Sequence, residues 1–140
     1  MQNRKLKPEL RLINMENVAV EQVEWLLYPF IPYGKVTIIQ GDPGEGKTTM
    51  VLQIIAKLTK GEPVLPITEE EEITTEQTRE PVNVIYQTAE DGLGDTIKPR
   101  LLAAGADCSK VLVIDDSEQP LTMLDERLEQ AIRQTNARLV

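Results

Sequence analysis

The sequence predicts an α/β fold, a parallel sheet with helices on both faces, and three observations support this class. Short runs of β-branched residues alternate with segments of helical periodicity. A glycine-rich loop stands between one such run and the helical segment that follows it. The chain has 140 residues, which is enough for one domain with a single core but not for two.

The first half of the chain contains the clearest helix. Residues 1–24 are expected to form an N-terminal arm, in which the apolar residues from Asn17 onward suggest a short helix or turn ending near 25–28. Residues 35–40 are β-branched and bounded by glycines, so they predict a buried strand. Residues 47–60 predict a helix that ends at Gly61. Its apolar positions are Met50, Val51, Ile54, Ile55 and Leu58.

The second half continues the alternation after a weakly patterned segment. Residues 62–81 predict a flexible insertion into a main domain that spans 25–140. Residues 82–87 and 111–114 predict two further strands, and 138–140 look like the opening of a fourth. The remaining helices are expected over 93–104, which Gly105 ends, and over 121–134, with Leu124, Leu128, Ala131 and Ile132 on one face.

Composition and charge exclude several classes of protein. No apolar run approaches the roughly 18 residues that a membrane-spanning helix needs, and the N-terminus is polar rather than a secretory signal. One cysteine, Cys108, and the absence of histidine argue against an internal disulfide and a zinc site and fit a reducing cytoplasm. The net charge of −8 disfavours attraction of nucleic acid over the whole surface. A basic cluster near the N-terminus is interpreted as a solvated tail: Arg4, Lys5, Lys7 and Arg11.

The loop between the first strand and the first long helix predicts a phosphate-binding site. Its pattern, Gly-x-x-x-x-Gly-Lys-Thr, lets successive backbone N–H groups surround the phosphates of ATP. Lys47 would supply a charge to the β- and γ-phosphates, Thr48 would ligate Mg²⁺, and Thr49 would reach the α-phosphate. Glu45 is expected to point to solvent, because its charge would repel phosphates. The binding residues are Gly41, Asp42, Pro43, Gly44, Glu45, Gly46, Lys47, Thr48 and Thr49.

Two acidic segments are candidates for the chemistry of ATP hydrolysis, which needs a group that orients the attacking water. Glu90 and Asp91 follow strand 82–87, at the carboxyl end of the sheet where ligands bind in such folds. Glu90 is interpreted as catalytic, together with Lys47, and Asp91 as the cap of the next helix. Asp115 follows strand 111–114, which by pattern alone resembles a Walker B strand, and there it would hold Mg²⁺ through water.

Two stretches resemble a known family. Trp25, the run from Ile31 to Thr37 and the loop up to Thr49 look like the entry to a RecA-type P-loop ATPase core. The stretch from Ala89 to Asp107 is also similar to one branch, the RepA-like hexameric replicative helicases and AAA ATPases of phage and plasmid origin. The resemblance covers about residues 25–140.

That resemblance implies roles beyond those read from the residues alone. The resemblance makes Glu90 the catalytic glutamate and places the Walker B strand later, with its opening at 138–140. On this basis we expect the chain to be truncated and its RecA-like core to be incomplete at the C-terminus. The fragment itself is then expected to hydrolyse ATP weakly or not at all. The complete protein is expected to be a cytoplasmic ATPase that acts on single-stranded DNA as a homo-oligomeric ring or filament, in DNA replication as a helicase or in recombination and repair. A P-loop phosphotransferase that uses Asp115, or a nucleotide-dependent regulator without turnover, are the alternatives.

Overall fold

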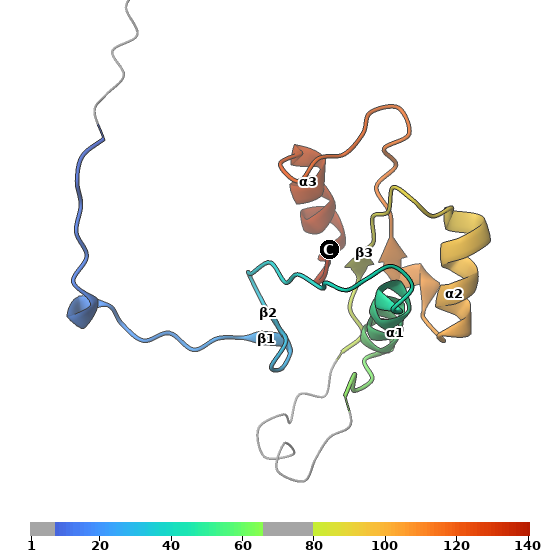
Figure 1. The fold of residues 1–140 in the computed structure, drawn as a ribbon, viewed down its shortest axis with the longest axis horizontal. Coiled ribbons are helices and arrows are strands. Elements are labelled where there is room, and N and C mark those ends of the chain that lie inside the picture. The colour runs from blue at the N-terminus through green and yellow to red at the C-terminus, as the bar shows by residue number, and fades with distance from the viewer. Residues whose placement is uncertain (1–7, 66–79) are drawn as a thin grey trace, which may run out of the picture. The chain divides into compact units, whose positions relative to one another are not determined.

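The computed structural model describes residues 8–65 and 80–140. Contacts between residues divide the chain into two compact units, 1–35 and 36–140 (Figure 1). Within the described residues no helix is both long enough and apolar enough to cross a membrane. Three of the four residues of the predicted basic tail lie outside the described part, and the fourth, Arg11, forms an exposed ion pair with Glu9 at 3.3 Å.

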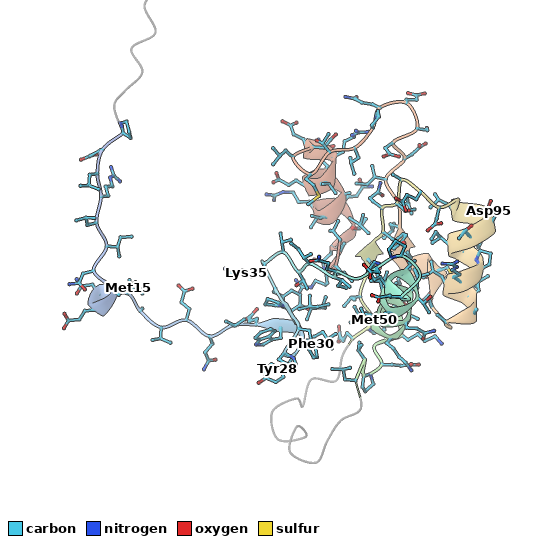
Figure 2. The ribbon with its side chains drawn as sticks, viewed as in Figure 1. Met15, Tyr28, Phe30, Lys35, Met50 and Asp95 are labelled. Carbon is cyan, nitrogen blue, oxygen red and sulfur yellow. The ribbon has the colours of Figure 1, made fainter. Side chains whose placement is uncertain are left out.

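The N-terminal unit contains a short antiparallel ribbon. Strand β1 (Trp25–Leu27) pairs with β2 (Ile31–Pro32), and the rings of Trp25 and Tyr28 meet edge to face at 5.3 Å. Tyr28 and Phe30, labelled in Figure 2, lie in the connection between the two strands.

The helix expected between Asn17 and residues 25–28 is wrong. A single 3₁₀ turn, η1, spans Met15–Asn17, and the chain is extended beyond it. The apolar side chains of the extended segment are exposed, Val20 to 99%. An apolar stripe favours a helix only where it has a surface to cover, because most helical stability in proteins comes from packing.

The predicted helix over 47–60 is confirmed. Helix α1 spans Lys47–Lys60, and the residues at its two ends, Gly46 and Gly61, have positive φ angles of 86° and 69°. Glycine adopts this conformation without the strain that a Cβ would cause. The apolar face of α1 is buried, with Ile55 only 1% exposed.

Parallel pairing around one central strand confirms two of the predicted strands in position, although they are shorter than expected, and a bridge lies at the third. Strand β3 (Val84–Ile85) pairs with β4 (Val111–Leu112), and Val84 forms a parallel bridge with Leu139 on the other side. The Ile85 amide donates to the Leu139 carbonyl at 2.9 Å, and the Tyr86 amide donates to the Leu112 carbonyl at 2.8 Å. The segment at 138–140 thus lies parallel to β3 through one bridge, and the strand predicted to open there stays a prediction.

The core lies where α1, β3 and the next helix meet. That helix begins as a π-helical turn, η2 (Leu93–Ile97), and continues as α2 (Lys98–Ala103), close to the predicted limits. The buried cluster draws on all of these elements: Leu52, Ile55, Val84, Ile97 and Leu101. Figure 1 shows α1 and α2 close together, with α3 apart from them.

Removal of one buried side chain from this cluster tests the placement of the core. We expect Ile55→Ala to lower the free energy of unfolding by about 2–4 kcal/mol, because it leaves a cavity against β3 and α2. The exposed residue Gln53 of the same helix provides the control, since Gln53→Ala should change the free energy by less than about 0.5 kcal/mol. Urea denaturation measures both, and equal midpoints for the two variants would contradict this core.

The strand predicted over 35–40 is wrong. Residues 36–40 belong to no helix and pair with no described strand, and the side chains of Val36 and Ile38 are 81% and 83% exposed. β-Branched residues favour an extended backbone and a packed surface, but a strand also needs a neighbour for its N–H and C=O groups. The β-propensity of a segment does not show whether a second strand lies beside it to accept and donate these hydrogen bonds.

Both ends of the predicted insertion are fixed to the last turn of α1. The Glu62 amide donates to the Lys57 carbonyl at 2.9 Å, and the Val82 amide donates to the Leu58 carbonyl at 3.1 Å. The Lys57 ammonium also pairs with the Glu62 carboxylate at 3.0 Å, which lowers the pKa of that carboxyl. The expected flexibility of the insertion concerns residues 66–79, which lie outside the described residues.

Helix α3 (Glu126–Thr135) begins five residues later than predicted. Asp125 is its N-cap and accepts from the Arg127 amide at 2.9 Å. Leu124, which was expected on the apolar face, precedes the cap and is 96% exposed. The acid at the cap satisfies a helix-terminal N–H group, and this local bond decides where the helix starts.

The cap also predicts a pH dependence of stability. Hydrogen bonds from the Arg127 side chain and amide lower the pKa of Asp125 to about 2. A carboxyl with a depressed native pKa adds stability above its unfolded pKa of about 3.9, and that stability is lost as the pH falls toward the native value. We therefore expect Asp125→Asn to destabilise the protein at pH 5 and to approach the wild type near pH 2. Urea denaturation across this range checks it, with Glu118→Gln as the control; a pH-independent difference would contradict the linkage.

Candidate functional site

The glycine-rich loop opens with a tight turn over Asp42, Pro43, Gly44 and Glu45. The Glu45 amide donates to the Asp42 carbonyl at 3.3 Å, and Gly44 has a φ of 84°. Proline in the second position and a positive-φ glycine in the third are the residues that a type II turn requires. A Cβ on Gly44 would meet no atom within 4 Å, so the backbone angle, rather than lack of space, demands glycine here.

Lys47 folds back over the start of the loop. Its ammonium donates to the Gly41 carbonyl at 2.6 Å and to the Asp42 carbonyl at 2.7 Å. An ammonium has three N–H donors, so one remains to meet a ligand in a direction that the other two fix. Lys47 and Thr48 are half-buried, whereas the turn in front of them is exposed. The loop therefore holds a positive charge in a defined place at the start of α1.

The first turn of α1 supplies backbone donors beside this charge. The Met50 amide, on the residue labelled in Figure 2, donates to the Gly46 carbonyl at 2.9 Å. The amides of Lys47, Thr48 and Thr49 precede it, in the turn where an α-helix gives N–H groups no intrahelical acceptor. Such amides and the positive end of the helix dipole bind phosphate oxygens. The local geometry thus fits a phosphate group, although the predicted strand in front of the loop is missing.

Glu45 does not simply point to solvent, as the sequence had suggested. The residue is exposed, but its Oε2 accepts a hydrogen bond from the Asp42 amide at 2.8 Å. The Asp42 N–H group is therefore already hydrogen-bonded to Glu45, and Pro43 has no N–H group. The Glu45 amide donates to the Asp42 carbonyl, so from Asp42 onward the amides that could donate to a phosphate are those of Gly44 and of residues 46–49.

Glu90 and Asp91 stand on a short turn after β3. The Thr88 hydroxyl accepts from both amides, at 3.3 Å for Glu90 and 3.4 Å for Asp91. Glu90 is exposed at the carboxyl end of the central strand, whereas Asp91 is half-buried and raises the pKa of Tyr86, together with the larger effect of burial. The edge position of Glu90 is the one that the sequence predicted.

The capping role predicted for Asp91 is wrong. Gly92 is the N-cap of η2, without a side-chain cap, and its carbonyl accepts from the Thr96 and Ile97 amides at 3.2 and 3.1 Å. The wide π-helical first turn starts from the Gly92 carbonyl, so an acid one residue earlier is not in the cap position. Asp95 lies inside this turn (Figure 2).

Gln87 ties the ends of β3 and β4 together, a role that the sequence analysis missed. Its side-chain amide donates to the Ile114 carbonyl at 3.2 Å, and its Oε1 accepts from the Ile114 amide at 2.6 Å. The Gln87 side chain thus makes the hydrogen bonds to Ile114 that a backbone pair would make in a longer sheet. The backbone after Gln87 leaves the sheet and forms the turn that carries Glu90. A polar residue directly after an apolar strand was the signal available in the sequence.

The second acidic segment is engaged locally. The Asp115 carboxylate accepts from the Ser117 amide at 3.1 Å, and hydrogen bonds from Ser117 lower the pKa of this carboxyl. The neighbouring Asp116 accepts from the Leu121 amide at 3.3 Å. Both acids hold the connection that leads toward α3. Asp115 lies near the carboxyl end of β4, and its interpretation as a Walker B residue stays a prediction.

Mg²⁺ fits this loop only as an ion that the phosphates bring with them. In the described part of the chain, no three Asp, Glu, Cys or His side chains gather in a way that could hold a metal ion. Mg²⁺ commonly binds through one or two protein oxygens plus substrate phosphates and water. Thr48, half-buried in the first turn of α1, carries the one hydroxyl predicted for that purpose.

Comparison with known proteins adds one finding. A family model described as an AAA domain matches residues 2–140. No curated protein and no solved structure matches the chain significantly.

Proposed function

Because the chain belongs to the AAA domain family, which indicates a nucleotide-binding domain of the ATPase type, we propose that the loop from Gly41 to Thr49 binds the phosphates of ATP. One observation carries the proposal: the Lys47 ammonium is fixed by the Gly41 and Asp42 carbonyls. It is held in place beside the first amides of α1, so a point charge and a set of backbone donors converge on one anion.

Each part of the loop has its own role in this proposal. Lys47 binds the β- and γ-phosphates with its remaining N–H group, and the amides of Gly44 and of residues 46–49 bind the α- and β-phosphates. The Thr48 hydroxyl ligates Mg²⁺, which neutralises phosphate charge when it is bound, and Thr49 reaches the α-phosphate. These roles need only backbone geometry, one ammonium and two hydroxyl groups, all of which the loop contains.

ATP hydrolysis is the proposed reaction, with Glu90 as the carboxylate that orients the attacking water. Its exposed position after β3, at the carboxyl end of the central strand, supports this role. The resemblance to RecA-type ATPases supports a further step: that the protein works on single-stranded DNA as a ring or filament of identical subunits. The net charge of −8 means that such DNA contacts would have to be local.

Hydrolysis of ATP by the full-length protein, measured with and without single-stranded DNA, tests this function. Stimulation by DNA is the expected result. Turnover that is blind to DNA would favour a phosphotransferase, and transfer of phosphate to an acceptor other than water would establish one. Tight ATP binding without turnover would favour a regulator that responds to the bound nucleotide.

A further inference from the structure

We propose that Glu45 is a positioning residue of the phosphate loop, whose carboxylate closes the turn that precedes α1 and so increases nucleotide affinity without contacting a phosphate. The inference rests on the proposed function of the same loop. It starts from two bonds between the same pair of residues. The Glu45 amide donates to the Asp42 carbonyl at 3.3 Å, and the Asp42 amide donates to Glu45 Oε2 at 2.8 Å.

The Glu45 and Lys47 side chains fix the same short stretch of backbone from different groups. The Lys47 ammonium donates to the carbonyls of Gly41 and Asp42, while the Glu45 carboxylate accepts from the Asp42 amide. Glu45 Oε2 also lies 2.7 Å from the position that a Cβ on Gly41 would have, so it sits against the Gly41 backbone. The carbonyls that hold the Lys47 ammonium are therefore themselves held in place.

A turn that is already closed loses less conformational entropy when a ligand binds, and this saving appears as affinity. The charge of Glu45 acts in the opposite direction, because a carboxylate in the loop repels phosphates. Comparison of the wild type with a neutral variant would mix the two effects. Two neutral variants separate them: Glu45→Gln keeps an oxygen that can accept from the Asp42 amide, and Glu45→Ala does not.

We expect the chain with Glu45→Ala to bind ATP about 3- to 10-fold more weakly than the chain with Glu45→Gln, the range that one net hydrogen bond supports. Isothermal titration calorimetry measures both, with ADP as a second ligand. ADP should show the same ratio, because the turn acts on the loop and not on one phosphate. Thermal unfolding should be alike for the two variants, since Glu45 is exposed. Equal affinities, or a loss confined to ATP, would overturn the inference.

Amide exchange separates failure of this inference from failure of the proposed function. Nuclear magnetic resonance should show faster hydrogen exchange of the Asp42 amide in Glu45→Ala than in Glu45→Gln, because only the latter retains an acceptor. If neither the wild type nor any variant bound ATP, the proposed function would be wrong. The exchange rates would still show whether the Asp42 amide donates to the Glu45 carboxylate. Identical exchange in the two variants would overturn the bond itself.

Discussion

Replacement of Lys47 by alanine is expected to weaken ATP binding by about 10- to 150-fold while leaving the fold intact. The side chain provides the positive charge of the loop and ties its ammonium to the Gly41 and Asp42 carbonyls. Alanine removes the charge–phosphate bonds, and each hydrogen bond to a charged group contributes about 1.5–3 kcal/mol. Calorimetric titration with ATP measures the loss, and circular dichroism checks that the helices remain.

Lys60 provides the matched control for that substitution. It lies in the last turn of the same helix, at the end opposite to the loop. Lys60→Ala changes the net charge by the same amount, so a general electrostatic effect would weaken ATP binding equally in both variants. We expect Lys60→Ala to keep the wild-type affinity. Retained affinity in Lys47→Ala would remove Lys47 from the phosphate site.

Glu90→Gln in the full-length protein is expected to lower the rate of ATP hydrolysis by about 10²- to 10⁴-fold, the usual contribution of a general base. ATP affinity should stay near the wild-type value, because Glu90 follows β3 and is not part of the loop that holds the phosphates. Glutamine keeps the size of the side chain but cannot take a proton from water. A single-turnover assay and a binding titration measure the two quantities separately.

Two neighbouring substitutions show whether Glu90 is the right carboxylate. Asp91→Asn should retain most of the hydrolysis, because Asp91 is half-buried whereas Glu90 is exposed. Asp115→Asn should also retain it, because the Ser117 amide already engages this carboxylate; loss of hydrolysis would instead favour Asp115 as the residue that binds Mg²⁺ through water. Full turnover in Glu90→Gln would contradict its assignment.

Local chemistry explains the parts of the fold that the sequence predicts well. Helix α1 lies within the predicted limits because glycines stand at both of its ends, and a regular apolar period fills the interval. Strands β3 and β4 lie in the predicted runs because apolar residues occur there without helical spacing, buried in β3 and half-buried in β4. The phosphate loop could be predicted for the same reason, since its turn, its glycines and its lysine are contiguous.

The errors concern partners that are distant in sequence. The run over 36–40 has strand propensity, but pairing depends on backbone groups elsewhere that propensity does not encode. The bond between Gln87 and Ile114 joins residues 27 positions apart, so the polar residue at the end of the strand is a local signal that does not identify its partner. The start of α3 is a local exception: Leu121 and Leu124 extend the apolar pattern ahead of the helix, whereas the Asp125 cap sets the true start five residues after the predicted one.

The central claim is that the loop from Gly41 to Thr49 is the phosphate site, and mapping of backbone amides during an ATP titration tests it most directly. In ¹⁵N-labelled protein with Mg²⁺, we predict the largest shifts at the amides of Gly44, Gly46, Lys47, Thr48 and Thr49. The Asp42 amide should move less, because Glu45 already accepts from it. Saturable shifts centred on any other part of the chain, or no shifts at millimolar ATP, would contradict the account.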